Sequence, residues 1–168
     1  MPKNKENQEK EEVECVKIFL PFYTKKEVNY IKPYYIQNHA VDVVVHFKDG
    51  TSQKIQHTMG DQHHGKIYEK NITDRAKGKT QDRSSIVRDP HDQKNIQYFI
   101  SSIRAKIEKY NKKKEDISDV ILLLEDIGAF YKEDFDIYFA ENSDSGLVGS
   151  FKEVWYVGRF KNRVYKIL

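Results

Sequence analysis

Apolar positions recur with a helical period in two segments of the chain. Residues 5–20 begin with Glu and Lys and continue with an apolar stripe, and residues 94–112 carry a longer stripe of the same kind. Because side chains three and four positions apart share one face of an α-helix, both segments are predicted to be amphipathic helices. Pro21 is expected to end the first helix or to follow its end, since proline lacks the N–H that a helix interior needs. The stripes consist of Val13, Val16, Phe19 and Leu20 in the first segment and Ile96, Phe99, Ile100, Ile103, Ile107 and Tyr110 in the second.

Val41, Val43, Val45 and Phe47 occupy every second position and alternate with Asp42, Val44 and His46, which predicts a β-strand with an apolar face. The tripeptide that follows, Lys-Asp-Gly at residues 48–50, is a strong signal for a tight turn. Residues 51–58 are therefore expected to pair back antiparallel and to complete a hairpin. Polar groups lie on one face of this hairpin, so it is the first place to look for chemistry.

Further strands are predicted in the second half of the chain. Residues 119–127 form a nearly continuous apolar run, as is typical of a strand buried on both faces in the centre of a sheet. The second helix is expected to pack on this strand, with Ile103 and Leu123 as core residues of the two elements. Residues 151–168 are predicted to form two more strands joined by a turn.

Three segments give weaker signals. Residues 22–33 are compatible with a short helix that stops before Pro33, and residues 130–140 have mixed periodicity. Residues 59–93 form a polar, basic stretch that is longer than an ordinary loop, and we expect it to be functional or partly helical. The order of elements predicts a single domain over residues 1–168 of the α/β class, with a central mixed β-sheet flanked by helices.

The composition excludes several classes of protein. Of the 168 residues, 38% are apolar and 33% are charged, and a domain of this length can bury a sufficient core without a disulfide. The only cysteine, Cys15, excludes an internal disulfide and a zinc cluster built from cysteines, and it favours a reducing compartment. The charged N-terminus lacks a secretory apolar core, and no stretch approaches the roughly 18 apolar residues of a membrane span. We therefore expect a cytoplasmic protein.

The net charge is only +3, but the charges are unevenly distributed. Residues 102–114 contain six Lys or Arg and one Glu, whereas residues 115–144 contain ten Asp or Glu and one Lys. Such blocks indicate either a polarised surface or ordinary solvated helix and loop faces. The acidic block also admits an interaction protein that mimics nucleic acid or docks a basic partner.

The hairpin contains a candidate site for a divalent metal. Metal-dependent cleavage of a phosphodiester needs acidic oxygens to hold Mg²⁺ and usually a cation near the attacked phosphate. Asp42 on the first strand can converge with Gln56 and Thr58 on the second, because residues two apart share one face of a strand. Gln56 offers a carbonyl oxygen and Thr58 a hydroxyl, both weaker than a carboxylate and a lysine.

At these residues the chain resembles the PD-(D/E)XK nuclease superfamily, which has the restriction-endonuclease-like fold. Val-Asp-Val-Val-Val at residues 41–45 stands where the family has its Pro-Asp strand, and Ile-Gln-His-Thr at residues 55–58 stands where it has (D/E)-x-K. Residues 103–110 and 119–126 resemble the helix and the central strand that follow. As a pattern, the resemblance covers roughly residues 9–168.

The resemblance implies a set of site residues. Asp42 would be the main ligand of Mg²⁺ or Mn²⁺, and Gln56 an auxiliary ligand. Glu12 on the first helix would complete the metal shell, with Glu9 as the second choice, unless both are ordinary solvated charges. Lys106 on the second helix would replace the missing strand lysine, unless it only covers the edge of the apolar stripe.

The function that this resemblance implies is hydrolysis of DNA phosphodiesters by a nuclease-like protein of a mobile element, a phage or a defence system. Two positions depart from the family pattern, since Gln56 replaces the acidic ligand and Thr58 replaces the lysine. The alternative is therefore a catalytically inactive module on the same fold, which binds nucleic acid or a partner protein.

The long polar segment offers candidate contacts to nucleic acid. Its basic side chains would neutralise phosphates, and such binding would weaken as the salt concentration rises. A solvated loop without a ligand is the alternative. The candidate residues are Lys66, Lys70, Lys77, Lys79 and Arg83.

Histidine and cysteine carry less information about function. His57 is expected on the strand face opposite Gln56, among side chains that pack against a helix. Cys15 is expected to be a small buried residue with no obvious histidine partner. The adjacent His63 and His64 admit a metal site that no spacing rule supports.

Overall fold

Six β-strands form one mixed sheet in the computed structural model of the protein, and they lie side by side in the order in which they occur in the chain. The structure describes residues 3–34, 36, 39–59, 77–78, 93–126, 130–142, 147, 150–159 and 163–168. The strands are β1 (Val28–Pro33), β2 (Val43–Phe47), β3 (Ser52–Met59), β4 (Val120–Asp126), β5 (Glu153–Gly158) and β6 (Arg163–Lys166). The predicted central mixed sheet is confirmed.

Two helices connect the parallel neighbours of this sheet. β1, β2 and β3 form an antiparallel meander, whereas β4 lies parallel to both β3 and β5, and β6 returns antiparallel to β5. Helix α3 (Gln93–Lys112) comes between β3 and β4 in the chain, and α4 (Lys132–Glu141) comes between β4 and β5. Parallel strands need such crossover connections. Over the described residues, the chain up to β4 therefore runs through a helix, three strands, a helix and a strand.

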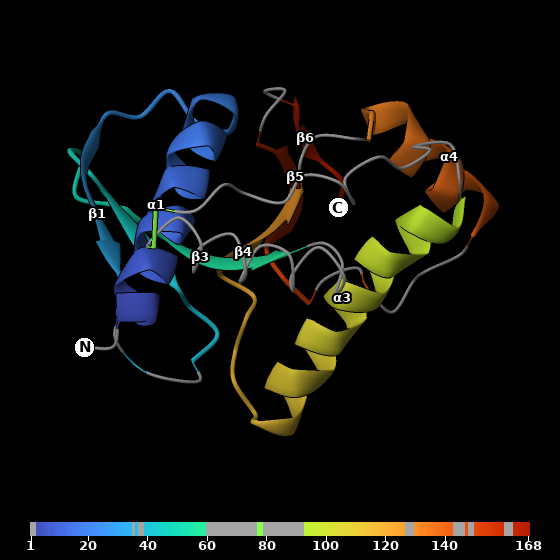
Figure 1. Ribbon diagram of the computed structural model, residues 1–168, viewed down its shortest axis with the longest axis horizontal. Coiled ribbons are helices and arrows are strands. Elements are labelled where there is room, and N and C mark those ends of the chain that lie inside the picture. The colour runs from blue at the N-terminus through green and yellow to red at the C-terminus, as the bar shows by residue number, and fades with distance from the viewer. Residues whose placement is uncertain are drawn as a thin grey trace.

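The sheet separates two apolar cores. Helix α1 (Lys3–Tyr23) covers one face of the sheet, and α3 and α4 cover the other (Figure 1). Along β4, which is buried over its whole length, Ile121 and Leu123 belong to the core under α1, and Leu122 and Leu124 to the core under α3. Because successive side chains of a strand point to opposite faces of the sheet, the single apolar run of β4 contributes to both cores. Ile103 of α3 and Leu123 therefore lie in different cores, although their elements are neighbours.

The predicted hairpin is confirmed. β2 and β3 pair antiparallel, with Val43 opposite Ile55. At the turn, the N–H of Phe47 donates to the carbonyl oxygen of Thr51 (2.9 Å), and Gly50 has a φ of 84°. Residues with a Cβ rarely adopt this left-handed conformation, so the glycine is what makes the tight turn possible.

Both predicted helices are present, with small differences at their ends. Every member of the apolar stripe of α3 is buried. α1 continues through Pro21 to Tyr23, so the expectation that Pro21 ends the helix or follows its end is wrong. A proline in the last turn removes only one backbone hydrogen bond, and the N–H of Thr24 still donates to the carbonyl of Leu20 (3.1 Å).

Two segments with weak signals form regular elements. Residues Val28–Pro33 form β1 and not a short helix, because they pair with β2 at the edge of the sheet. Pro33 ends this edge strand, where a missing N–H is tolerated. Residues Lys132–Glu141 form α4, which buries three of its ten side chains, and so few buried positions leave no clear helical period.

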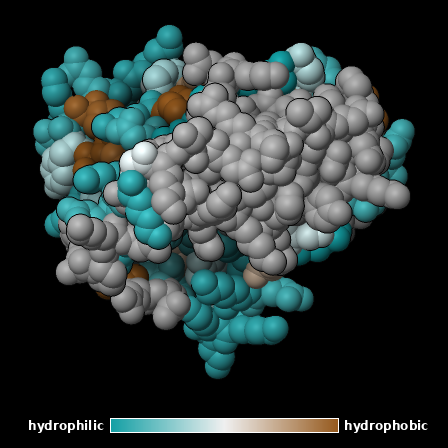
Figure 2. Space-filling view, viewed as in Figure 1, coloured by the Kyte–Doolittle hydropathy of each residue, from teal (hydrophilic) through white to brown (hydrophobic). Residues whose placement is uncertain are grey.

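The surface near the end of α3 is strongly polar. In the view of Figure 2, hydrophilic side chains cover the lower end of the molecule, where Figure 1 places the C-terminal part of α3. This end holds most of the basic block of residues 102–114, and its lysines from Lys109 onward are exposed.

Within the described part of the chain, no helix has the length and apolar character that crossing a membrane requires.

Candidate active site

The backbone of Asp42 is fixed between two strands, directly before β2. Its N–H donates to the carbonyl oxygen of Ile55 (2.9 Å), and its carbonyl oxygen accepts from the N–H of Tyr34 (2.8 Å). The side chain is half-buried, and its Oδ2 atom accepts a hydrogen bond from the backbone N–H of His57 (2.8 Å). The sheet therefore determines where this carboxylate lies.

Gln56 connects Asp42 to α3. Its Nε2 atom donates to Oδ2 of Asp42 and to the carbonyl oxygen of His57 (3.0 Å). Its Oε1 atom accepts a hydrogen bond from the hydroxyl of Tyr110 on α3 (2.5 Å). Gln56 thus presents its nitrogen to Asp42, and its predicted role as a metal ligand would require the amide group to turn over.

Glu12 of α1 is buried, with 6% of its surface exposed, and its carboxyl group lies within reach of the charge of Asp42. Burial and the negative charge of Asp42 raise the pKa of Glu12 to about 7, although Gln8 donates a hydrogen bond to its Oε1 (2.9 Å). Burial also raises the pKa of Asp42, against the backbone N–H of His57 and the positive charges of His57 and Lys106. A buried and a half-buried carboxylate whose negative charges interact favour a bound cation or proton.

Lys106 approaches the same place from α3. Its side chain is half-buried at the edge of the apolar stripe, whereas Lys109 is exposed. Burial lowers the pKa of Lys106, and the negative charges of Asp42 and Glu12 act in the opposite direction. The structure thus places Gln56 in contact with Asp42, and Glu12 of α1 and Lys106 of α3 lie near enough to Asp42 for their charges to interact with it.

The side-chain oxygen atoms at this place are partly suited to binding a divalent cation. Mg²⁺ and Mn²⁺ prefer oxygen ligands, and Asp42 and Glu12 supply two carboxylates whose repulsion a cation would relieve. Gln56 in its observed orientation adds no third protein oxygen. Because Mg²⁺ is usually bound through one or two carboxylates and keeps several waters, the two carboxylates fit such an ion.

A second polar group lies at the carboxyl ends of β3 and β4, on the side of the sheet that faces α1. His57 Nε2 lies 2.5 Å from Glu125 Oε2, and Arg159, just after β5, contacts Glu125 Oε1 (3.1 Å) and Glu11. Burial opposes a charge on His57, but the hydrogen bond and negative charge of Glu125 outweigh it and raise the pKa of His57. His57 does lie opposite Gln56 as predicted, but the sequence analysis missed its buried ion pair.

Cys15 is buried as expected, but it does have a histidine neighbour. Its Sγ atom, His57 Nε2 and a carboxylate oxygen of Glu125 lie within 4.8 Å of one another. Sequence reasoning missed this group because its members are far apart in the chain. One signal was present, since Glu125 and Asp126 end the apolar run, and ligand sites of open α/β sheets lie at the carboxyl ends of strands.

The predicted nucleic-acid contacts fall mostly outside the described residues. Lys77 is described, and it is exposed in a turn with Gly78. The contacts of this segment to nucleic acid therefore stay predictions. The nucleic-acid candidates that lie outside the described residues are Lys66, Lys70, Lys79 and Arg83, and the two histidines considered as metal ligands, His63 and His64, lie outside them as well.

The chain was compared with known proteins by sequence and by structure. No family model matches it, and neither a curated protein nor a solved structure does. The resemblance to the PD-(D/E)XK superfamily thus stays a prediction, and the functional argument depends on the geometry of the site.

We expect Glu12 to reduce the stability of the fold as the pH rises from about 4.5 to about 7. Its pKa is about 7 in the folded protein and 4.5 in the unfolded reference, so the folded state binds more protons in this interval. The free energy of unfolding should therefore fall with rising pH, by up to about 3 kcal/mol from this group, since one pKa unit corresponds to about 1.4 kcal/mol.

Urea unfolding of Glu12→Gln and of the wild type, at about pH 4 and about pH 8, measures this effect. At the lower pH, the variant and the wild type should have similar free energies of unfolding. At the higher pH, the variant should have the larger free energy of unfolding. Glu14→Gln removes an exposed carboxylate two positions away and serves as the control. Equal pH dependence of Glu12→Gln and wild type would contradict the prediction.

Proposed function

We propose that this protein is a divalent-metal-dependent nuclease that hydrolyses DNA phosphodiester bonds. The observation that carries the proposal is the group of Asp42 with its Gln56 contact, buried Glu12 and half-buried Lys106, in which the charge of Asp42 helps to raise the pKa of Glu12 and the charge of Lys106 opposes the rise in that of Asp42. Perturbed ionisable groups of this kind cluster at functional sites. Two carboxylates and one lysine are also what metal-dependent phosphodiester cleavage needs.

Each residue has its own role in this proposal. Asp42 and Glu12 would hold Mg²⁺ or Mn²⁺, which supplies Lewis-acid polarisation of the phosphate when bound. Gln56 orients the carboxylate of Asp42, and Tyr110 holds Gln56 in turn. Lys106 places a positive charge where negative charge develops on the attacked phosphate.

Two further observations support the proposal. The elements occur in the order on which the family resemblance was based, with β1 added before the strand that follows Asp42. Exposed lysines also lie on α3, the helix that carries Lys106. Such side chains bind the DNA backbone without regard to sequence, and they would hold a duplex near the site.

A non-catalytic binding module on the same fold is the second candidate. The orientation of Gln56 favours it, because an amide nitrogen contacts the Asp42 oxygen that a metal ion would otherwise bind. Thr58 also stands where the resembling family has its lysine. A module of this kind would bind DNA or a protein partner with no need for a divalent ion, so metal dependence distinguishes the two candidates.

A cleavage assay on plasmid and linear duplex DNA tests the proposal. The wild type should cut in the presence of Mg²⁺ or Mn²⁺ and should not cut in the presence of EDTA. Lys106→Ala should slow cleavage about 100-fold, the usual loss when one group that stabilises a developing negative charge is removed. Lys112→Ala removes the same charge from an exposed position of the same helix and should stay within a few-fold of the wild type.

Binding of a fluorescent duplex, measured in parallel, separates the outcomes. Metal-dependent cleavage that is sensitive to Lys106→Ala and insensitive to Lys112→Ala supports the nuclease. If the wild type binds DNA equally well with and without a divalent ion and cuts none, the binding module is the better description. Equal activity of the two lysine variants would remove Lys106 from the site.

A further inference from the structure

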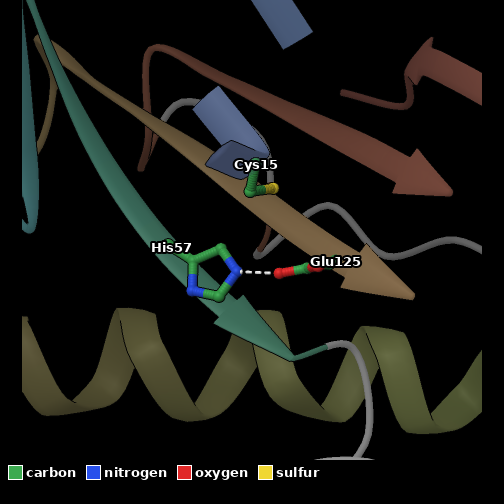
Figure 3. A group of neighbouring side chains, drawn as sticks. All are labelled: Cys15, His57 and Glu125. Carbon is green, nitrogen blue, oxygen red and sulfur yellow. Dashed lines mark hydrogen bonds and ion pairs between the residues drawn. The ribbon is translucent and has the colours of Figure 1, made fainter. Parts of the chain in front are cut away.

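Cys15, His57 and Glu125 bring three kinds of metal ligand together between α1 and the sheet (Figure 3). α1, β3 and β4 supply one residue each, and the ring nitrogen of His57 faces the carboxylate of Glu125. All three side chains are buried. Their ligand atoms lie within 4.8 Å of one another, which is close enough for one ion to reach all of them.

The chemistry of these ligands selects the kind of ion. A thiolate is a soft ligand and imidazole suits zinc, whereas Mg²⁺ prefers carboxylate, carbonyl and water oxygens. Zinc sites with three protein ligands keep the fourth tetrahedral position for water or a substrate. We propose that Cys15, His57 and Glu125 bind one Zn²⁺ ion, at a site separate from Asp42 and Lys106.

The spacing of the ligand atoms is close to that of a zinc site. Zinc lies about 2.3 Å from sulfur and about 2.0 Å from nitrogen, so the ligand atoms of a tetrahedral site are roughly 3.5 Å apart. His57 Nε2 and Glu125 Oε2 are now 2.5 Å apart, and no pair of ligand atoms exceeds 4.8 Å. A small opening of the His57–Glu125 pair and a small approach of Cys15 would produce the site.

Arg159 and Glu11 form the outer part of this site. Arg159 contacts Oε1 of Glu125, and Oε2 is the oxygen that faces His57. Outer partners of this kind orient a carboxylate ligand and raise metal affinity. Arg159 also contacts Glu11, so its positive charge has a second carboxylate partner.

A bound Zn²⁺ ion would leave this buried region close to neutral. Its two charges balance the thiolate of Cys15 and the carboxylate of Glu125 while His57 is neutral, and Arg159 balances Glu11. Buried charges are tolerated when they are paired or coordinate a metal. One divalent ion would therefore replace the thiol proton of Cys15 and the second ring proton of His57 without changing the net charge of the group.

Cobalt binding tests the inference directly, because Cys15 is the only cysteine of the chain. The full-length protein is reduced, freed of metal with a chelator and titrated with Co²⁺. We expect a thiolate-to-cobalt charge-transfer band in the near ultraviolet that saturates at one equivalent, with the visible bands of a tetrahedral site. Added Zn²⁺ should abolish both by competition.

Substitutions identify the remaining ligands. Cys15→Ser should abolish the charge-transfer band, and Glu125→Gln and His57→Gln should each weaken Co²⁺ binding at least about 10-fold, the lower limit even for partners of metal ligands. Glu14→Gln changes an exposed neighbour on α1 and should bind as the wild type does. Asp42→Asn should keep the full cobalt spectrum, so this test does not depend on the nuclease proposal.

The wild-type spectrum decides the matter even where a variant fails to fold. No charge-transfer band in folded wild-type protein would overturn the inference, because the only thiolate would then not bind the ion. A band that survives both Glu125→Gln and His57→Gln would overturn it as well. Loss of the band in folded Asp42→Asn would overturn the separation of the two sites, because the ion bound by Cys15 would then need Asp42 as well.

Discussion

Replacing Asp42 by asparagine should reduce metal-dependent DNA cleavage at least about 1000-fold, to the level measured with EDTA, because loss of a single stabilising group already costs about 100- to 1000-fold. The proposed nuclease relies on this carboxylate for its metal more than on any other group. Asparagine keeps an oxygen that can accept the His57 N–H, which now lies 2.8 Å from Oδ2, so the fold should be retained. The substitution also removes the negative charge that raises the pKa of Glu12.

Initial cleavage rates and thermal melts of the same preparations measure both parts of this prediction. Asp42→Ala should lose the same activity, and it should be less stable than Asp42→Asn because the His57 N–H loses its acceptor. Asp136→Asn, an exposed change on α4, is the control and should behave as the wild type. Wild-type activity in folded Asp42→Asn would falsify the assignment of Asp42 as the main metal ligand.

Ile103→Ala and Leu123→Ala should each lower the free energy of unfolding by about 2–5 kcal/mol, the usual cost of truncating a buried aliphatic side chain. Neither side chain is accessible to solvent. Because the two lie in cores on opposite faces of the sheet, the double variant should show the sum of the single losses to within about 0.5 kcal/mol. Ile103 and Leu122 share one core, so that pair should deviate further from additivity.

Urea unfolding of the single and double variants, followed by circular dichroism, gives the four free energies of each cycle. The m-values should stay constant, so that the differences report stability alone. A strong coupling between Ile103 and Leu123 would contradict their placement on opposite faces. A loss below about 0.5 kcal/mol at both positions, the range of ordinary surface substitutions, would contradict their burial.

The fold could be predicted wherever one face of an element is apolar. The stripe of α3, the alternation from Val41 to Phe47 and the glycine at the turn of the hairpin each indicate one conformation. The segment of β1 gave only an ambiguous signal because an edge strand of mixed burial has no clean alternation, and only pairing with β2 makes it a strand. The helix α4 was missed for the related reason that few of its side chains are buried.

The candidate site was only partly predictable for a different reason. Asp42 and Gln56 belong to one hairpin, so their proximity follows from local pairing, and the face of Lys106 follows from the helical period. The Glu125 partner of His57 lies 68 positions along the chain, and only the parallel pairing of β3 with β4 brings it there. The orientation of the Gln56 amide also depends on a partner from another element, the Tyr110 hydroxyl.

The parallel pairing of β3 with β4 also has a consequence for folding kinetics. The β2–β3 and β5–β6 pairs involve nearby segments and can form locally, but Lys54 meets Val120 only after a long stretch of chain has closed into a loop. Loop closure of this kind is slow because its entropy cost precedes the contacts that repay it. Asp42 and Glu12 precede that loop in the chain, Lys106 lies near its C-terminal end, and Glu125 follows it. The candidate active site and the group of Cys15, His57 and Glu125 should therefore form late in folding, when β3 pairs with β4.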